Sequence, residues 1–185
     1  MPLRSFAGKK PLIEKGAYID RNSLLIGEVH IGPGATIWPG TILRADDDRI
    51  EVDEGAAVLD MAFVEAPEGK PVRIGKGCII SHGAKLHGCK IEDGAMVGVG
   101  AIVLDDAVIG RNAILGAGSV VPPGERIPAM SLAIGSPARV LRKLTETDLA
   151  PITEGLKTIA EKAAQYGKES EDREADKGAN HKSKP

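Results

Sequence analysis

The sequence predicts an all-β protein, a parallel β-helix of six-residue repeats followed by one C-terminal α-helix, and three observations predict it. An aliphatic residue recurs about every six residues, a residue that tolerates positive φ usually follows three positions later, and a small residue usually lies two positions before it. The aliphatic positions are Ile13, Ile19, Leu25, Ile31, Ile37, Leu43, Val52, Val58, Val64, Ile74, Ile80, Leu86, Ile91, Val97, Val103, Ile109, Leu115 and Val121.

Bends that recur this often leave only short straight segments, and three such segments close one triangular coil. Only small side chains fit inside the corners. An amphipathic helix would need apolar spacings of three and four, and ordinary alternating strands would not produce three linked positions per repeat. The pattern is therefore that of a hexapeptide β-helix, whose coils stack on one another.

Residues 1–12 lead into the coils, and residues 13–143 form the β-helix. The six-residue period slips between Leu43 and Val52 and again between Val64 and Ile74, where extra residues are inserted. We expect loops to leave the coils there, at residues 46–49 and 65–70. Such excursions often carry function.

A C-terminal helix is predicted over residues 144–167. Thr145 and Asp148 have the form of a capping box at its start, and an apolar stripe follows at helical spacing. Residues 168–185 contain no apolar side chain larger than alanine, so we expect a disordered tail in which His181 has no role. The stripe consists of Ile152, Leu156, Ile159, Ala163 and Tyr166.

The composition excludes several classes of protein. With 24 basic and 26 acidic residues and a net charge of -2, the chain offers no basic surface for nucleic acid or an anionic membrane. No apolar run is long enough to span a membrane or to serve as a secretion signal, so we expect a cytoplasmic protein. Cys78 and Cys89 occupy small-residue positions, and packing in a corner is the expected role of both.

The register of the coils places polar residues in columns. If Leu43, Val64 and Leu86 share one face in successive coils, the residues that follow them, Arg44, Glu65 and His87, are stacked.

By the same count Val58 and Ile80 share another face, which stacks Asp60 under His82. His82 would approach Glu65 and His87 only if β-helices packed side by side as a trimer.

Two imidazoles and a carboxylate form a ligand set that suits zinc or non-haem iron. The alternative from register alone is that His82 and His87 are ordinary surface or interface histidines. For Arg44, Asp46 and Asp60 we expect ion pairs or hydrogen bonds at a subunit interface. His30 belongs to no cluster and is expected to face solvent.

The block SHGAKLHGC, with Arg44, Asp46 and Asp60 upstream of it, resembles the γ-class carbonic anhydrases over about residues 10–165. The resemblance implies a left-handed β-helix that forms a homotrimer, with one zinc ion, or iron or cobalt in its place, at each subunit interface. It also implies that His82 and His87 are metal ligands from different subunits.

Three positions depart from the family pattern. Glu65 stands where the family has its third histidine ligand, and Ala57 and Leu59 replace an asparagine and a glutamine near the metal-bound water. Asp47 and Glu68 fall where some active members place acidic loop residues, one of which shuttles protons. A glutamate ligand would make the bound water less acidic, and loss of two orienting amides typically costs tenfold to a hundredfold in activity.

Three functions follow as alternatives. The first is zinc-dependent reversible hydration of carbon dioxide to bicarbonate, and the second is a catalytically silent trimer that acts as a scaffold or metal-binding protein. The third is acyl transfer from coenzyme A, since many hexapeptide proteins use a histidine base for it and a fold does not fix a function.

Overall fold

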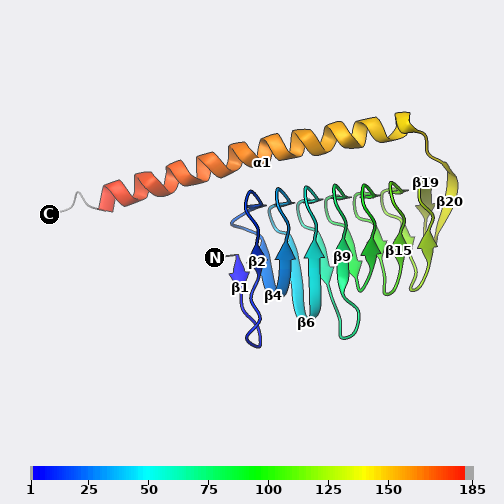
Figure 1. Cartoon of the computed structure of the whole chain (residues 1–185), viewed down its shortest axis with the longest axis horizontal. Helices are drawn as coiled ribbons and strands as arrows, with labels where there is room; N and C mark the ends of the chain where they lie inside the picture. The colour runs from blue at the N-terminus through cyan, green and yellow to red at the C-terminus, as the bar shows by residue number, and fades with distance from the viewer. Residues whose placement is uncertain (1, 182–185) are drawn as a thin grey trace.

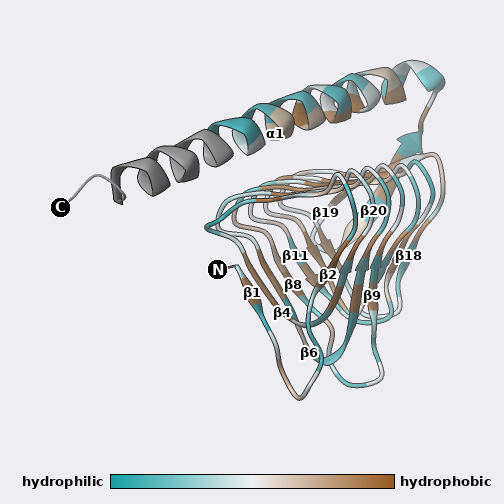
Figure 2. Ribbon diagram, turned by 60° about the vertical axis from the view of Figure 1, so that its left-hand side comes forward, coloured by the Kyte–Doolittle hydropathy of each residue, from teal (hydrophilic) through white to brown (hydrophobic). Residues whose placement is uncertain are grey.

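The computed structural model describes residues 2–181, and the side chains of residues 2–169. The chain winds into a stack of triangular coils, and one long helix, α1 (Glu146–His181), runs along the stack (Figure 1). Figure 2 shows the coils nearly superimposed, so that three flat faces run the length of the stack. The predicted parallel β-helix of six-residue repeats is confirmed.

Two faces belong to one 12-stranded sheet, because the long strand β6 continues from one face to the next. This sheet contains β1 (Leu3–Arg4), β2 (Leu12–Ile13), β4 (Leu24–Ile31), β6 (Ile42–Val52), β8 (Phe63–Glu65), β9 (Val72–Ile74), β11 (Lys85–His87), β12 (Lys90–Ile91), β14 (Ile102–Val103), β15 (Val108–Ile109), β17 (Val120–Val121) and β18 (Arg126–Ile127).

The third face is an eight-stranded sheet, and α1 lies against it. Its strands are β3 (Tyr18–Ile19), β5 (Thr36–Ile37), β7 (Ala57–Val58), β10 (Ile79–Ile80), β13 (Met96–Val97), β16 (Ile114–Leu115), β19 (Ser131–Gly135) and β20 (Ala138–Lys143). All pairs within it are parallel except β19 with β20, which form an antiparallel hairpin.

The core is the predicted column of aliphatic side chains. From Leu25 to Val121 every residue of the series is essentially inaccessible to solvent, whereas Ile13 and Ile19 at the first coil are half-buried. The small positions are buried with them, including Ala56, Ala84 and Ala95. The interior side chains of each coil therefore pack mainly against those of the coils above and below it.

The bends fall where predicted in most of the coils. Asn112 (φ 53°) and Asp106 (φ 60°) adopt positive φ, as do the predicted glycines, and even Met61 (φ 60°) holds this conformation. The prediction was wrong elsewhere: Asn22 and Asp46 do not adopt positive φ, and three bends lie one or two residues from the predicted position, at Gly27, Gly69 and Gly88. Glycine carries no Cβ penalty in this region, so it determines where the bend settles.

The first predicted excursion differs from the structure. Residues 46–49 do not form a separate loop but lie within β6, where they bulge opposite Glu28 of β4. The ladder resumes at once, with Val29 paired to Ile50, which keeps the segment in the sheet. The second excursion is a loop between β8 and β9, closed by a hydrogen bond from the Lys70 amide to the Pro67 carbonyl at 2.9 Å.

Both ends of the β-helix also differ from the sequence-based boundaries. Within residues 1–12, β1 already pairs with β4, with Leu3 opposite Leu25. At the other end α1 continues beyond Gly167 to His181, so residues 168–181 are helical where a disordered tail was expected. The side chain of His181 and residues 182–185 lie outside the described part of the chain.

The predicted capping box matches the structure, although α1 begins at Glu146 rather than at residue 144. The Thr145 amide and hydroxyl donate hydrogen bonds to Asp148 Oδ2 at 2.8 and 2.9 Å, and Arg142 donates two more to the same carboxylate. The guanidinium of Arg142 and the Thr145 donors hold the pKa of Asp148 well below its usual range. The predicted stripe faces the eight-stranded sheet through Ile152, Leu156, Ile159 and Ala163, while Tyr166 packs edge-on against Trp38.

Candidate metal centre

The predicted polar column exists in a single chain. Arg44 of β6 is in register with Glu65 of β8, and Glu65 is in register with His87 of β11. The three side chains touch in the same order: Arg44 Nη2 donates to Glu65 Oε1, and Glu65 Oε2 lies 4.0 Å from His87 Nε2. The side chain of Glu65 is only 17% exposed, so the pair sits in a partly desolvated position.

The two oxygens of Glu65 have different partners. Oε1 accepts a charge-assisted hydrogen bond from Arg44, which fixes the carboxylate, and Oε2 remains directed at His87. One carboxylate oxygen and one imidazole nitrogen thus face each other without a hydrogen bond between them. That arrangement offers two adjacent ligands for a cation.

Asp105 completes the column and was missed by the sequence analysis. Its Oδ1 is hydrogen-bonded to His87 Nδ1, and its Oδ2 lies 3.4 Å from Lys70 Nζ. A carboxylate only accepts hydrogen bonds, so Nδ1 of His87 is the donor in this contact, and Nε2, which faces Glu65, is the ring nitrogen that a metal ion could use. The hydrogen bond from His87, with the charge of Lys70, lowers the pKa of Asp105 and keeps it ionised.

The sequence contained a signal for Asp105. Val103 continues the register of Leu86 by one coil, and Asp105 lies at the corner that follows it. The predicted column ended at His87 because the residue next to Val103 is Leu104, which is not polar.

His82 lies on a different face, as predicted. It follows β10 of the eight-stranded sheet, and its Nδ1 is 3.0 Å from Asp60 Oδ2, which confirms the predicted stacking of these two residues. Among the side chains that the structure describes, no three His, Cys, Asp or Glu residues of one chain converge as a metal site. One chain therefore brings together Glu65 and His87 but not His82.

Ala57 and Leu59 lie beneath α1. Both are buried, in a second apolar cluster with Trp38, Ile79 and Ala163. An amide at either position would have to be desolvated against apolar side chains of the helix, which is costly without a hydrogen-bond partner. The two departures from the family pattern therefore coincide with the surface on which the C-terminal helix packs.

The remaining predicted residues surround the column. Arg44 Nε and Asp46 Oδ1 are 3.5 Å apart, and both atoms are buried without a hydrogen-bond partner in the described structure. Asp47 in β6 and Glu68 in the loop after β8 are exposed. Within residues 2–169 neither forms a hydrogen bond or an ion pair with Glu65 or His87.

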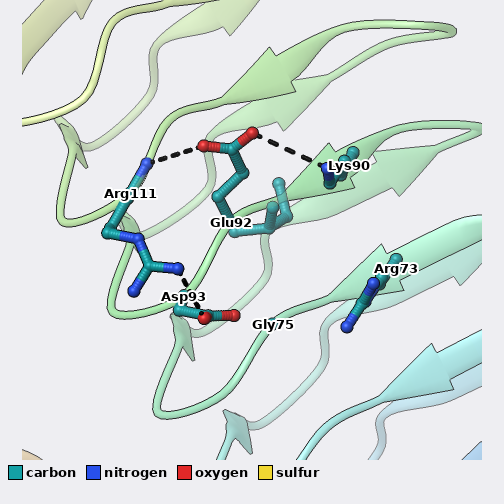
Figure 3. Close-up of a pocket in the computed structure, with 7 residues that line it drawn as sticks. Arg73, Gly75, Lys90, Glu92, Asp93 and Arg111 are labelled. Carbon is teal, nitrogen blue, oxygen red and sulfur yellow. Dashed lines mark hydrogen bonds and ion pairs between the residues drawn. The ribbon is translucent and has the colours of Figure 1, made fainter.

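A second polar surface covers the face formed by β9, β12, β15 and β18. Arg73, Lys90, Glu92, Asp93 and Arg111 line a shallow cavity of about 290 Å³ there (Figure 3).

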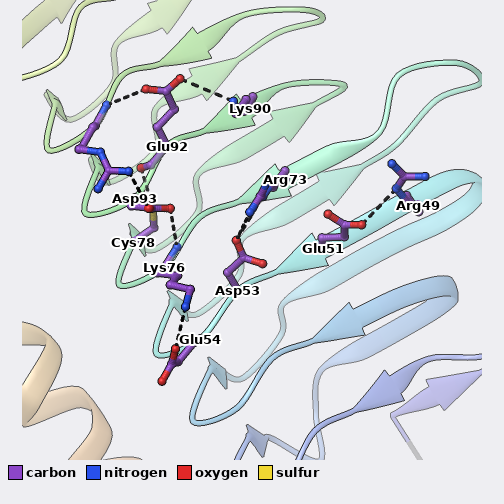
Figure 4. A network of polar contacts seen from close by, with 11 residues as sticks. Arg49, Glu51, Asp53, Glu54, Arg73, Lys76, Cys78, Lys90, Glu92 and Asp93 are labelled. Atoms are coloured by element: carbon purple, nitrogen blue, oxygen red, sulfur yellow. Dashed lines mark hydrogen bonds and ion pairs between the residues drawn. The ribbon is translucent and has the colours of Figure 1, made fainter.

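Ion pairs cross this face from coil to coil, as in Arg73 with Asp53 at 2.9 Å (Figure 4) and Arg111 with Asp93 at 3.0 Å (Figure 3). Each of these exposed ion pairs contributes little to stability. Because each arginine there already has a carboxylate partner, this surface does not offer a free cation for binding an anion.

The two cysteines have the predicted structural role. Cys78 and Cys89 are free and buried in the core, and burial raises the pKa of each thiol to about 12.

His30 is partly exposed and lies 3.2 Å from Glu14. The helix described here is not apolar enough over its length to cross a membrane.

The coils and the stacked column define this chain as a hexapeptide-repeat β-helix protein. The family described as bacterial transferase hexapeptide (six repeats) matches residues 88–123. A hexapeptide transferase family protein from Anaplasma phagocytophilum has a similar crystal structure, with a TM-score of 0.85 and 36% sequence identity over 89% of this chain and 97% of that one.

Sequence relatives define the family more closely. A Methanocaldococcus jannaschii protein named "Probable carbonic anhydrase" is 45% identical over 86% of this chain and 96% of its own length. Gamma carbonic anhydrase 1 of Arabidopsis thaliana, a mitochondrial protein, is 36% identical over 88% of this chain. The chain spans about 61% of that relative's length. The chain belongs to the γ-carbonic anhydrase family.

Proposed function

We propose that this chain is the subunit of a homotrimer that holds a metal ion at each subunit interface and catalyses the reversible hydration of carbon dioxide. Glu65 and His87 of one subunit and His82 of the next would hold the ion. Two histidines and one carboxylate are a ligand set that zinc uses in catalytic sites, and iron or cobalt also suit it.

The observation that carries this proposal is the facing pair of Glu65 Oε2 and His87 Nε2, 4.0 Å apart. Asp105 supports it, because a carboxylate hydrogen-bonded to the far nitrogen of a ligating histidine is the usual way to fix its tautomer and orientation. The ligand atoms are thus oriented within one chain, and the residues present fit a zinc ion.

The charged groups around the pair support a subunit interface at this position. Arg44 Nε and Asp46 Oδ1 are buried and have no hydrogen bond within the described part of the chain, and such atoms normally have a partner. A neighbouring subunit or interface water would provide one. His82 and Asp60, on the other face, would then lie at the interface opposite Glu65 and His87 of a neighbouring subunit.

When bound, zinc supplies a Lewis acid that makes water acidic enough to act as a nucleophile near neutral pH. The residues of this chain would orient the ligands through Asp105 and Arg44, while exposed Glu68 or Asp47 would pass protons to solvent. Ala57 and Leu59 place no polar group toward the reactants, which makes slow turnover the expected outcome.

Metal analysis and stopped-flow kinetics test the proposal. Protein purified without chelators should contain one metal ion per chain, and hydration of carbon dioxide at pH 7 to 9 should exceed the buffer rate. Metal without turnover would support the silent metal-binding trimer instead. Absence of stoichiometric metal would contradict the metal centre itself.

A restoring variant separates weak catalysis from none. Glu65→His with Ala57→Asn and Leu59→Gln should raise the hydration rate if the missing groups limit it. Because Ala57 and Leu59 pack under α1, the thermal midpoint of this variant must be measured alongside the rate. A folded, metal-loaded variant with an unchanged rate would contradict this explanation of weak activity.

Acyl transfer is the second candidate, favoured by the similarity to the hexapeptide transferase family protein. Saturable binding of acetyl-coenzyme A to the trimer would support it. If acetyl-coenzyme A at millimolar concentration did not bind, acyl transfer would be excluded as a candidate function.

A further inference from the structure

A cavity of about 370 Å³ lies between α1 and the eight-stranded sheet. Pockets of small-molecule sites measure roughly 300 to 1,000 Å³, so this one can take a compact organic ligand. Carbon dioxide or bicarbonate would fill only a small part of it. The lining residues are Trp38, Leu59, Asp60, His82, Gly155, Thr158, Ile159 and Lys162.

One wall of the cavity is apolar. Trp38 and Leu59 are 9% and 8% exposed, and Ile159 of α1 packs against the cluster to which they belong. The indole nitrogen of Trp38 already donates to Thr36 Oγ1 at 3.1 Å, so the ring offers the cavity an apolar surface rather than a free donor. Leu59 is part of this apolar wall because it is a leucine where the family has a glutamine.

The opposite side carries charge. Asp60 and His82 are paired with each other at 3.0 Å, which leaves Lys162 as the lining cation. Within the described side chains Lys162 forms no ion pair, although several other lysines, such as Lys70 and Lys76, do. An unpaired ammonium beside an apolar wall is complementary to a molecule with an apolar body and one negative charge. Asp60 would repel a second negative charge.

We propose that this cavity binds a small aliphatic monocarboxylate, with the carboxylate at Lys162 and the apolar body against Trp38 and Leu59. Binding there needs no metal ion and extends beyond the proposed hydration of carbon dioxide. His82 borders both sites, so a ligand in the cavity would lie beside the proposed metal centre.

The tryptophan makes the proposal directly testable, because Trp38 is the only tryptophan of the chain. Its fluorescence in chelator-treated full-length protein is titrated with hexanoate, with hexan-1-ol, which lacks the charge, and with acetate, which lacks the apolar body. Hexanoate should give a saturable change. Hexan-1-ol should bind up to about fivefold more weakly, since one partly exposed charge pair is worth up to about that factor. Acetate should bind more weakly still, because it lacks the methylene groups that would be buried against Trp38 and Leu59.

Two lysine variants test whether Lys162 is the cation that binds the carboxylate. Lys162→Met should weaken hexanoate binding about fivefold and leave hexan-1-ol unchanged, while Lys157→Met, an exposed lysine of the same helix outside the cavity, should bind like the wild type. No saturable response to hexanoate, or equal hexanoate binding by Lys162→Met, would overturn the proposal. Because the protein is metal-free throughout, neither result bears on the metal centre.

Discussion

The role of Asp105 gives the sharpest prediction about the candidate metal centre. Asp105→Leu removes the hydrogen bond to His87 Nδ1 while keeping a side chain of similar length. His87 can then rotate and can carry its proton on Nε2, the atom that faces Glu65 at 4.0 Å. Loss of such an orienting partner typically lowers metal affinity tenfold to a hundredfold, or about 1.4 to 2.8 kcal/mol.

Zinc affinity measured by competition with a chromophoric chelator tests this directly. Asp106→Asn is the matched control, because Asp106 also pairs with Lys70 but does not touch His87, and asparagine tolerates the positive φ of this position. Nitrogen-15 spectra of the metal-free protein should show His87 protonated on Nδ1 in the wild type and in Asp106→Asn, with loss of that preference in Asp105→Leu. Wild-type zinc affinity in a folded Asp105→Leu variant would refute the assigned role.

Three further predictions concern the fold. Leu86→Ala, in the fully buried column, should lower the free energy of unfolding in urea by about 2 to 5 kcal/mol, whereas Leu141→Ala on the exposed side of β20 should change it little; equal effects would contradict the assigned core. Cys78 and Cys89 should both resist a thiol reagent in the native protein and react after denaturation, because they are buried with pKa values of about 12; rapid native labelling would disprove this. Asp148 has a depressed pKa, so its stabilising effect exists above the unfolded pKa of about 4 and is lost as the pH falls below that value. The difference in unfolding free energy between the wild type and Asp148→Ala should therefore shrink below about pH 4. A difference that grew with acidity would contradict the depressed pKa.

The regular coils could be predicted because each repeat is a local unit. Burial of Leu43, Val64 and Leu86 in one column required only a period of six and a consistent count between slips. The same count placed Glu65 beside His87 and His82 beside Asp60, since neighbouring coils stack in register.

The wrong predictions concern segments to which the six-residue period does not apply. Residues 46–49 stay in β6 because the partner strand β4 resumes pairing at Val29. The sequence of residues 46–49 does not contain this information about the partner strand. The helix extends past Gly167 because a single glycine costs only about 1 kcal/mol in a helix interior. The packing of Leu59 under α1 joins segments far apart in sequence, for which the repeat gives no rule.

The central claim is that one metal ion is held by Glu65 and His87 of one subunit and His82 of the next, and mixed trimers test it most directly. A Glu65→Ala, His87→Ala chain and a His82→Ala chain are co-expressed with different affinity tags, and trimers that carry both tags are isolated. Each double-tagged trimer has one interface with all three ligands intact, so it should bind one zinc ion, while trimers of either variant alone should bind none. Double-tagged trimers without zinc, or single-variant trimers that retain it, would contradict a site shared between subunits.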